Sequence, residues 1–194
     1  STGTVSDSSS TPTTTCTVEL LGPTEAAALA DEIRVIYRTA FAASSDRWDK
    51  SELGITAFEN DIFPRHLARE GFGMTTARNN DGKLVAFCYG YIGEHGQYWT
   101  DYVAARIHPS LEKAWLGGHF EIAELAVESE ERGKGLGRAL LTTLLESRGD
   151  DSVALQTLEQ NSPALPLYES LGFTAFGEFE NYVVLGRRRG NAPA

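Results

Sequence analysis

A strand, a glycine-rich turn and a helix follow one another between residues 120 and 147, and this succession restricts the fold more than any other feature. Phe120 to Val127 has the apolar character of a buried strand. After a polar turn comes the run Arg132-Gly133-Lys134-Gly135-Leu136-Gly137-Arg138, which opens a helix with leucines 136, 140, 141, 144 and 145 on one stripe. Unbonded amides and the positive dipole end at the start of such a helix form an anion site.

The glycine spacing excludes two common phosphate-binding loops. A Walker loop has four residues between its glycines and then Gly-Lys-Ser/Thr, which is absent here. The dinucleotide fingerprint is Gly-x-Gly-x-x-Gly, whereas these glycines fall at 133, 135 and 137. The alternative without a ligand is a flexible glycine turn beside a solvated basic cluster of Arg132, Lys134 and Arg138.

Strand and helix patterns alternate along the rest of the chain. They predict strands at about 16–21, 74–78, 83–92, 120–127, 152–158 and within 173–185, and helices at about 23–42, 51–70, 135–147 and 163–171. The turn Asn79-Asn80-Asp81-Gly82 predicts a hairpin between two of the strands. We interpret residues 96–117 as a helical or looped insertion. The expected fold class is α/β (α+β), with helices packed on a mixed sheet.

Composition and charge limit the class of protein. We expect a tail at 1–15, rich in Ser and Thr, one domain at 16–187 and a flexible tail at 188–194. The net charge of −10 disfavours a nucleic-acid partner. No apolar run is long enough to span a membrane, and no secretory signal is visible, so we expect a cytoplasmic protein, although a chain that begins at Ser1 leaves a removed leader open. Cys16 and Cys88 are expected to be reduced thiols.

Two motifs resemble one known family. Arg132-x-x-Gly135-x-Gly137, after a strand and at the start of a helix, resembles the acyl-CoA loop of the GNAT superfamily of N-acetyltransferases. A second family motif follows at the expected distance, as Asn161-x-x-Ala164-x-x-Leu167-Tyr168-Glu169-x-x-Gly172-Phe173. The motif resemblance runs from about Phe120 to Leu185, and the N-terminal half is similar only in its order of elements. It implies a mixed, mostly antiparallel central sheet of six to seven strands, flanked by helices on both faces.

The resemblance also implies how a cofactor would bind. Acetyl-CoA would be the co-substrate, and no metal is expected, since the four histidines have no ligand spacing. Backbone amides would hold the pyrophosphate, from Arg132, Gly133, Lys134, Gly135, Leu136, Gly137 and Arg138. The main chain of Leu125, Ala126 and Val127 would pair with the pantetheine arm as an added strand does. Asn161 would hydrogen-bond the pantetheine or its neighbouring backbone, and the resemblance leaves a homodimer open.

Tyr168 is the candidate general acid. It lies seven positions after Asn161, about two helical turns, which predicts that both side chains share a face. A phenol can donate its proton to a departing thiolate of similar basicity, and Tyr168 matches the family's general acid. The structural alternative is a core tyrosine whose hydroxyl is satisfied locally.

Glu124 is the candidate general base. Strand alternation predicts that it shares a face with Phe120 and Ile122, while Glu121 points the other way. A carboxylate beside apolar groups has a raised pKa, which suits proton abstraction. Alternatively, Glu124 binds a cationic acceptor or supports a hydrogen-bond network. Gln156 stands where relatives that acetylate ribosomal protein N-termini carry a glutamate, which makes that acceptor less favoured.

The expected function is therefore acetyl transfer from acetyl-CoA to a primary amine of a small-molecule acceptor, by direct attack in a ternary complex. The alternatives are a non-catalytic acyl-CoA-binding sensor module and a peptide or protein N-acetyltransferase. The acceptor pocket is expected between the N-terminal helices and residues 96–117. Six aromatic residues are candidates for its lining or for the core: Trp48, Phe63, Tyr89, Tyr91, Trp99 and Tyr102.

Overall fold

The computed structural model describes residues 16–42, 52–149 and 153–188. The elements in chain order are β1 (Thr17–Leu21), α1 (Pro23–Ala27), α2 (Ala30–Ala42), α3 (Glu52–Ala57), the π-helical turn η1 (Phe58–Ile62), α4 (Phe63–Leu67), β2 (Gly73–Arg78), β3 (Leu84–Gly93), α5 (Tyr98–Ala104), α6 (Pro109–Trp115), β4 (His119–Val127), the short 3-10 turn η2 (Ser129–Glu131), α7 (Leu136–Glu146), β5 (Val153–Glu159), α8 (Leu165–Ser170), β6 (Thr174–Phe179) and β7 (Tyr182–Arg188). The expected tail at 1–15, residues 189–194 and Trp48 lie outside the described residues.

One sheet contains all of these strands, in the order β1-β2-β3-β4-β5-β7-β6. Every neighbouring pair is antiparallel except β4 with β5, which are parallel and are connected through α7. The predicted β2–β3 hairpin is confirmed. The Asn79 side-chain oxygen holds its turn by accepting the amides of Asp81 and Lys83, each at 3.0 Å.

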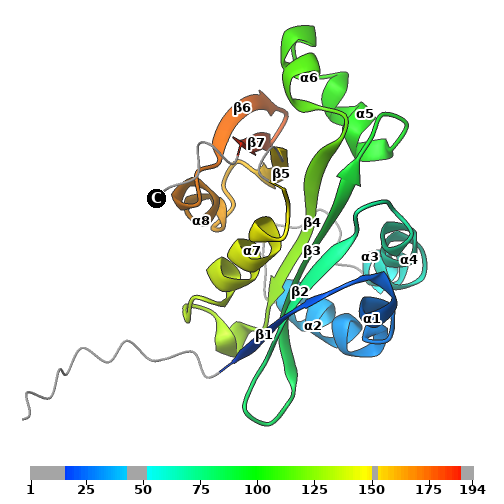
Figure 1. The fold of residues 1–194 in the computed structure, drawn as a ribbon, viewed down its shortest axis with the longest axis vertical. Helices are drawn as coiled ribbons and strands as arrows, with labels where there is room; N and C mark the ends of the chain where they lie inside the picture. Colours follow the sequence, from blue (N-terminus) through cyan, green and yellow to red (C-terminus); the bar gives the residue numbers. More distant parts are fainter. Residues whose placement is uncertain (1–15, 43–51, 150–152, 189–194) are drawn as a thin grey trace, which may run out of the picture.

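Helices cover both faces of the sheet, as the sequence predicted (Figure 1). On one face, α7 places the predicted leucine stripe against Phe120 and Ile122 of β4, and α8 adds Tyr168 to the same apolar cluster. On the other face, the helices before β2 pack residues such as Ile33 and Ile36 against Tyr89 of β3. The predicted mixed, mostly antiparallel sheet with helices on both faces is therefore confirmed.

The N-terminal helices are more broken than the sequence predicted. The helix expected over 23–42 is divided into α1 and α2, because the Leu29 amide bonds to Ala26 O, three residues back, and tightens the chain into a turn. The stretch expected over 51–70 contains a π-helical turn between α3 and α4, where the Phe63 amide reaches back five residues to Phe58 O. Four apolar side chains of α1 and α2 are nevertheless buried on one side: Ala26, Ile33, Ile36 and Tyr37.

The insertion at 96–117 forms α5 and α6, which pack against the C-terminal strands. Trp115 stacks on Phe176 of β6 with ring centroids 4.8 Å apart. The Arg188 guanidinium lies 3.8 Å above the Trp115 ring, so this arginine, expected in the tail, ends β7. A Cβ at Gly186 would lie 2.5 Å from the same ring, so a glycine allows the close approach of α6.

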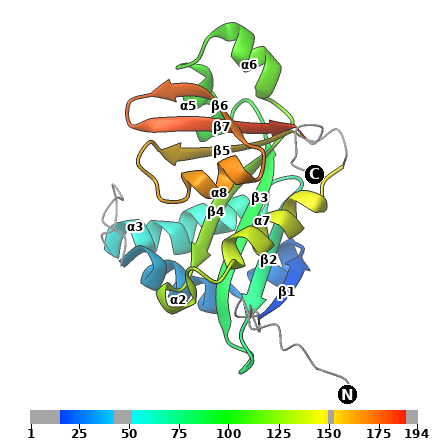
Figure 2. The same ribbon diagram turned by 90° about the vertical axis from the view of Figure 1, so that its left-hand side faces the viewer.

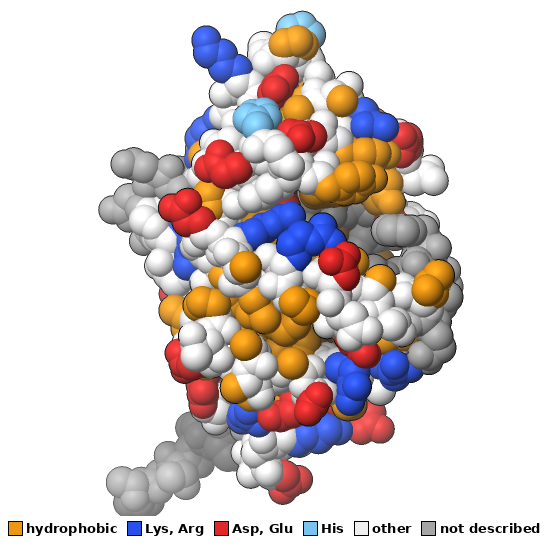
Figure 3. All heavy atoms as spheres, turned by 90° about the vertical axis from the view of Figure 1, so that its right-hand side faces the viewer, with side chains coloured by type: hydrophobic (Ala, Val, Ile, Leu, Met, Phe, Trp, Pro, Cys, Tyr) orange, Lys and Arg blue, Asp and Glu red, His pale blue; other side chains and the backbone are white. Residues whose placement is uncertain are grey.

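The described residues on the side covered by the N-terminal helices carry charges of both signs. Figure 3 shows that Lys and Arg side chains on this side are interspersed with Asp and Glu. Nucleic-acid binding requires a continuous basic surface. Within the described residues, no helix combines the length and the apolar character needed to cross a bilayer.

Candidate active site

The sheet separates in its middle, between β4 and β5. These strands pair only at Phe120 with Ala154 and at Glu121 with Leu155. β4 then continues to Val127 and β5 to Glu159, and no further pair joins their described residues. In Figure 2, β1–β4 run along the vertical while β5–β7 run across it. The facing main-chain edges beyond this point are therefore open to an added strand, and Leu125, Ala126 and Val127 lie on one of them.

The glycine turn presents unbonded amides at the start of α7. Gly135 is the N-cap in the left-handed region, with φ of 82°, and the first helical bond runs from the Ala139 amide to Gly135 O at 3.1 Å. Within the part of the chain described, the amides of Gly135, Leu136, Gly137 and Arg138 donate to no protein acceptor. Together with the helix dipole, these donors would favour an anion, so the predicted anion site stays a prediction. The Arg132 amide, which the prediction also included, donates to Ser129 O at 3.4 Å.

The basic side chains of the turn are engaged in local contacts. Arg132 donates from Nη2 to Ala40 O at 2.9 Å and from Nε to Val127 O at 3.3 Å, which ties the turn to α2 and β4. Lys134 pairs with Glu131 at 3.0 Å, and Arg138 donates to Ser170 Oγ of α8 at 2.6 Å. The basic side chains expected here are present, but that of Arg132 is bonded to the main chain of α2 and β4.

Gly137 brings three elements together. A Cβ at this position would lie 3.2 Å from Leu167 Cδ2 of α8 and 3.7 Å from Leu125 Cδ2 of β4. The third glycine of the motif therefore has a packing role. It lets the first turn of α7 approach both α8 and the open edge of β4.

The Tyr168 hydroxyl lies deep in the molecule beside β5. Tyr168 is 1% exposed, and its ring makes an edge-on contact with Phe173 at 5.3 Å between centroids. Gln156 Nε2 donates to the phenol oxygen at 3.0 Å. Burial raises the pKa of Tyr168 well above its ordinary value, and the hydrogen bond from Gln156 opposes this shift.

Asn161 does not lie on the helix that carries Tyr168, so the prediction of a shared helical face is wrong. The helix α8 begins only at Leu165, and Asn161 lies exposed in the turn after β5. Pro163 explains the difference, because a proline disfavours the helical region for the residue before it. The Asn161 side chain is exposed, and the turn after β5, not α8, sets its position.

A β-bulge overturns the predicted face of Glu124. The register passes from Gly90 opposite Ile122 to Tyr89 opposite Glu124, so that Ala123 is the extra residue. Opposed residues lie on the same face, which places Glu124 with Tyr89 and the N-terminal helices. Phe120 and Ile122 face α7 instead. Glu121, expected on the opposite face to Glu124, therefore shares its face.

Glu121 belongs to a buried hydrogen-bond network that sequence reasoning missed. Tyr91 Oη donates to Glu121 Oε2 at 2.8 Å, and His119 Nε2 lies 3.3 Å from Oε1. The Gly117 amide donates to His119 Nδ1 at 3.1 Å, so the proton of this imidazole is on Nε2 and is given to Glu121. Both carboxylate oxygens thus accept a bond. Glu121 therefore has a structural role as a hydrogen-bond acceptor. Glu124 stays the candidate base.

The predicted aromatic candidates divide between two places. Phe63, Tyr89 and Tyr91 are buried in the cluster under the N-terminal helices. Trp99 stacks on Tyr102 at 5.1 Å between centroids, and the Tyr102 hydroxyl donates to Glu180 Oε2 of the β6–β7 turn at 2.6 Å. The structure therefore supports the core interpretation for the first group and places the second group against the C-terminal hairpin.

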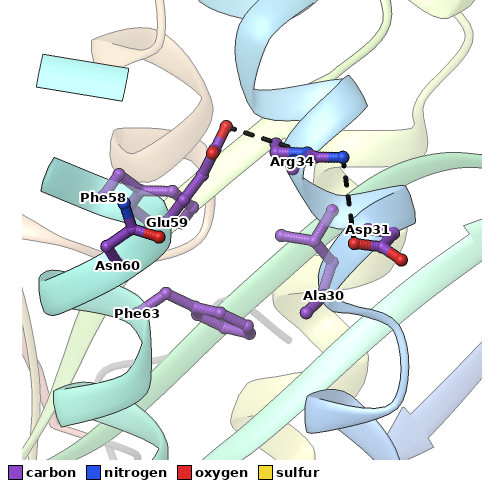
Figure 4. A pocket seen from close by; sticks show the side chains of 8 residues that line it. Ala30, Asp31, Arg34, Phe58, Glu59, Asn60 and Phe63 are labelled. Carbon is purple, nitrogen blue, oxygen red and sulfur yellow. Dashed lines mark ion pairs between the residues drawn. The ribbon is translucent and has the colours of Figure 1, made fainter. Parts of the chain in front are cut away.

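A hollow between α2 and η1 is lined by neither the glycine turn nor Tyr168 (Figure 4). Arg34 lies between Asp31 and Glu59, at 3.8 and 3.9 Å, and Phe63 forms part of the wall. The hollow is at the N-terminal half of α2, whereas Arg132 contacts Ala40 near its other end, about 9–15 Å further along the helix. We do not assign it to the acyl-transfer site. No group of three metal-binding side chains occurs in the described ranges.

Comparisons with known proteins agree with this geometry. The protein is 34% identical over 128 residues to a GCN5-like protein acetyltransferase of Mycobacterium tuberculosis, covering 58% of this chain and 62% of that one. It is 48% identical over 82 residues to a mycothiol acetyltransferase of Thermobispora bispora, covering 41% of this chain and 26% of the other. The chain thus spans less than two thirds of the length of these relatives.

The fold is shared with solved structures. The protein yncA of Salmonella typhimurium, solved with its cofactor acetyl-CoA, superposes with a TM-score of 0.57 at 20% identity, covering 92% of this chain and 96% of that one. The sequence profile of the acetyltransferase (GNAT) family matches residues 31–173, which include the glycine turn, the open edge of β4 and Tyr168. This chain belongs to the acetyltransferase (GNAT) family.

Proposed function

We propose that this protein transfers an acetyl group from acetyl-CoA to a primary amine of a small molecule, by direct attack in a ternary complex. The observation that carries the proposal is the set of unbonded amides at the start of α7, beside a sheet that separates between β4 and β5. An anion site and an open main-chain edge are the two features that a long ligand with a pyrophosphate and an amide-bearing arm needs.

The residues present fit coenzyme A. Amides of the turn up to Arg138 would hold the pyrophosphate, with those from Gly135 onward at the helix end. The Arg132 amide already donates to Ser129 O at 3.4 Å and would contribute least. The main chain of Leu125, Ala126 and Val127 would bond to the pantetheine arm, and Asn161 would contact that arm from the turn after β5. Bound there, acetyl-CoA supplies an activated acyl group as a thioester.

Glu124 and Tyr168 would handle the protons. Glu124 accepts a proton from the acceptor amine as its nitrogen bonds to the acyl carbon. The carbon–sulfur bond breaks, its electron pair passes to sulfur, and Tyr168 gives that sulfur a proton, so that the products are an amide and a free thiol. Tyr168 then recovers a proton from solvent or from the proton taken by Glu124. The role of Tyr168 is proposed from the family motif, and that of Glu124 from its place on β4.

Transfer through an enzyme cysteine is disfavoured. Cys88 faces the same cluster as Tyr168, but its side chain is fully buried. Burial strongly raises the pKa of the Cys88 thiol, and the charge of Glu124 adds to this. A thiol in this state is a poor nucleophile at neutral pH, which supports direct attack by the amine.

The small-molecule acceptor is supported by the relative named mycothiol acetyltransferase, whose match is 48% identical. A protein acceptor is the second candidate, because the relative that matches 58% of this chain is named a protein acetyltransferase.

A thiol-release screen tests the proposal. Purified protein with acetyl-CoA would be offered a panel of small amines, amino-acid derivatives and lysine or N-terminal peptides, with free thiol measured. The proposal expects acceptor-dependent release with at least one small amine and a loss of release in the Tyr168→Phe variant. Release only with peptides would move the assignment to a protein acceptor. Calorimetric CoA binding without release from any acceptor would contradict catalysis.

A further inference from the structure

Gln156 sits between the open edge of β5 and the phenol of Tyr168, and its orientation is fixed by the backbone. The Thr157 amide donates to Gln156 Oε1 at 2.9 Å. A backbone amide can only donate, so the atom that it meets must be the oxygen of the side-chain amide. The nitrogen end, Nε2, is therefore the end that faces Tyr168, at 3.0 Å from Oη.

This orientation of the Gln156 side chain determines the direction in which the Tyr168 hydroxyl can donate its proton. A primary amide nitrogen has no lone pair to offer, so Tyr168 Oη must accept from Gln156 and must aim its own proton elsewhere. Among the described residues, no protein atom accepts that proton. Buried hydroxyl groups normally donate to some partner, so an undonated proton at a 1% exposed phenol points to a ligand atom.

The separation of the sheet is the origin of this arrangement. β4 pairs with β5 only as far as Leu155, and the next residues of β5 lose that neighbour. The Thr157 amide then bonds to the Gln156 side chain instead of to a strand. Ala154 of β5 pairs with Phe120, and Phe120 faces α7 and α8. Residues two apart on a strand lie on the same face, so Gln156 also faces α8 and Tyr168. The separation of β4 from β5 therefore also fixes the orientation of the Gln156 side chain beside the phenol.

We infer that Gln156 is a positioning residue, which occupies an acceptor site of the Tyr168 oxygen and leaves the phenol proton directed at the sulfur of the thioester. The inference rests on the proposed acetyl transfer. A donor to the oxygen also stabilises the phenolate that remains after the proton has left. A glutamate at the same position would do the reverse, because an ionised carboxylate accepts the phenol proton and competes with the sulfur for it.

Three variants separate this role from simple packing. Gln156→Met keeps the length and removes the donor, Gln156→Glu replaces the donor by an acceptor, and Gln160→Met is the matched control on the same segment. The Gln160 side chain donates from Nε2 to the carbonyls of Glu180 and Tyr182, on the exposed surface away from Tyr168. Each change is made in the wild-type chain and in the Tyr168→Phe chain, with thermal unfolding measured for all.

The first readout is kcat with a functional acceptor. Gln156→Met is expected to lower kcat about tenfold with KM for acetyl-CoA unchanged, since one charge-assisted hydrogen bond is lost in the step that protonates sulfur. In the Tyr168→Phe background the same change should have no effect. For Gln156→Glu, the ratio of its kcat to that of wild type should rise as the pH falls, because a protonated carboxyl group can donate again. Gln160→Met should match wild type.

The second readout needs no acceptor. The thiol of bound CoA is titrated by the absorbance of its thiolate. A phenol that donates to sulfur lowers this pKa, so Tyr168→Phe and Gln156→Glu should raise it, and Gln156→Met should raise it by less. A CoA thiol that titrates identically in wild type and Gln156→Met, or that responds equally in the Phe background, would overturn the inference. Failure to release thiol with any amine, while the titration still depends on Gln156, would instead contradict only the proposed function.

Discussion

Tyr168 and Glu124 lie on opposite faces of the seven-stranded sheet, on either side of the place where β4 and β5 separate. Tyr168 belongs to the cluster beneath α7 and α8, whereas Glu124 opposes Tyr89 on the face of the N-terminal helices. A thioester held in the opening would therefore meet an acid from one side and a carboxylate from the other. This arrangement suits acyl transfer to an amine, because one group has to take a proton from the amine and another has to give a proton to the departing thiolate.

Replacing Tyr168 by Phe should lower kcat by about a hundredfold or more, the usual contribution of a positioned general acid. The aromatic ring and its contact with Phe173 remain, so CoA affinity should change little. Thiol release at saturating substrates measures the first effect and calorimetry the second. Full turnover in the Phe variant would remove Tyr168 from the mechanism.

The two glutamates of β4 should respond differently to the same substitution. Glu124→Gln should reduce kcat, because the proposed role of this carboxylate is proton transfer. Glu121→Gln should instead lower the free energy of unfolding by about 1–3 kcal/mol, because Tyr91 and His119 both donate to a carboxylate that an amide only half replaces. Urea unfolding and steady-state kinetics on both variants make the comparison. A reversed pattern would exchange the roles assigned to them.

The face of Glu124 could not be predicted from the sequence, although other features of the fold could. The leucine stripe of α7 and the β2–β3 hairpin were predicted correctly, because each follows from a local period or a local turn. The face of Glu124 was predicted wrongly, because one extra residue at Ala123 reverses strand alternation, and neighbours in sequence do not reveal a bulge.

The buried hydrogen-bond network of Glu121 could not be predicted from the sequence for a related reason. His119 and Glu121 are two residues apart on β4, but Tyr91 meets them only through the β3–β4 register. Register depends on pairing across the whole sheet and cannot be counted along one strand. The glycine turn, by contrast, was recognisable because its anion site is made by consecutive residues.

Gly135→Ala should weaken the binding of CoA. The residue has φ of 82°, and a side chain in the left-handed region costs about 1–2 kcal/mol, which shifts the turn and its amides. The dissociation constant for CoA should rise up to about tenfold, since 1.36 kcal/mol corresponds to one factor of ten. Pantetheine, which lacks the pyrophosphate, serves as the control ligand. An equal loss of affinity for both ligands would contradict an anion site at this helix end.

Arg132→Met should destabilise the fold more than Lys134→Met. Arg132 donates to two carbonyls, of Ala40 and Val127, and losing these charge-assisted bonds should lower the free energy of unfolding by about 1–3 kcal/mol. The pair formed by Lys134 and Glu131 is partly exposed, so its removal should change stability by less than about 1 kcal/mol. Chemical denaturation measures both. Equal effects would mean that Arg132 is not a tie between the turn and α2.

His66 should make stability fall in acid. Burial, with the charges of Arg69 and Arg65, lowers the pKa of His66 to about 3, so the folded protein keeps this imidazole neutral while the unfolded chain takes up a proton near pH 6.5. Stability from this group is complete above pH 6.5 and decreases towards pH 3, by at most about 1.4 kcal/mol per pH unit. His66→Gln should flatten the slope in urea unfolding between pH 7 and 4.5. An unchanged slope would mean that His66 is accessible to protons in the folded state.

A crystal structure with acetyl-CoA tests the central claim most directly. The pyrophosphate should lie on the amides of Gly135 to Arg138, and the pantetheine arm should follow the open edge of β4. The sulfur should come within hydrogen-bond distance of Tyr168 Oη, with Gln156 still bonded to the same oxygen. A cofactor bound elsewhere, for example in the hollow beside Arg34, or a sulfur far from the phenol, would contradict the account.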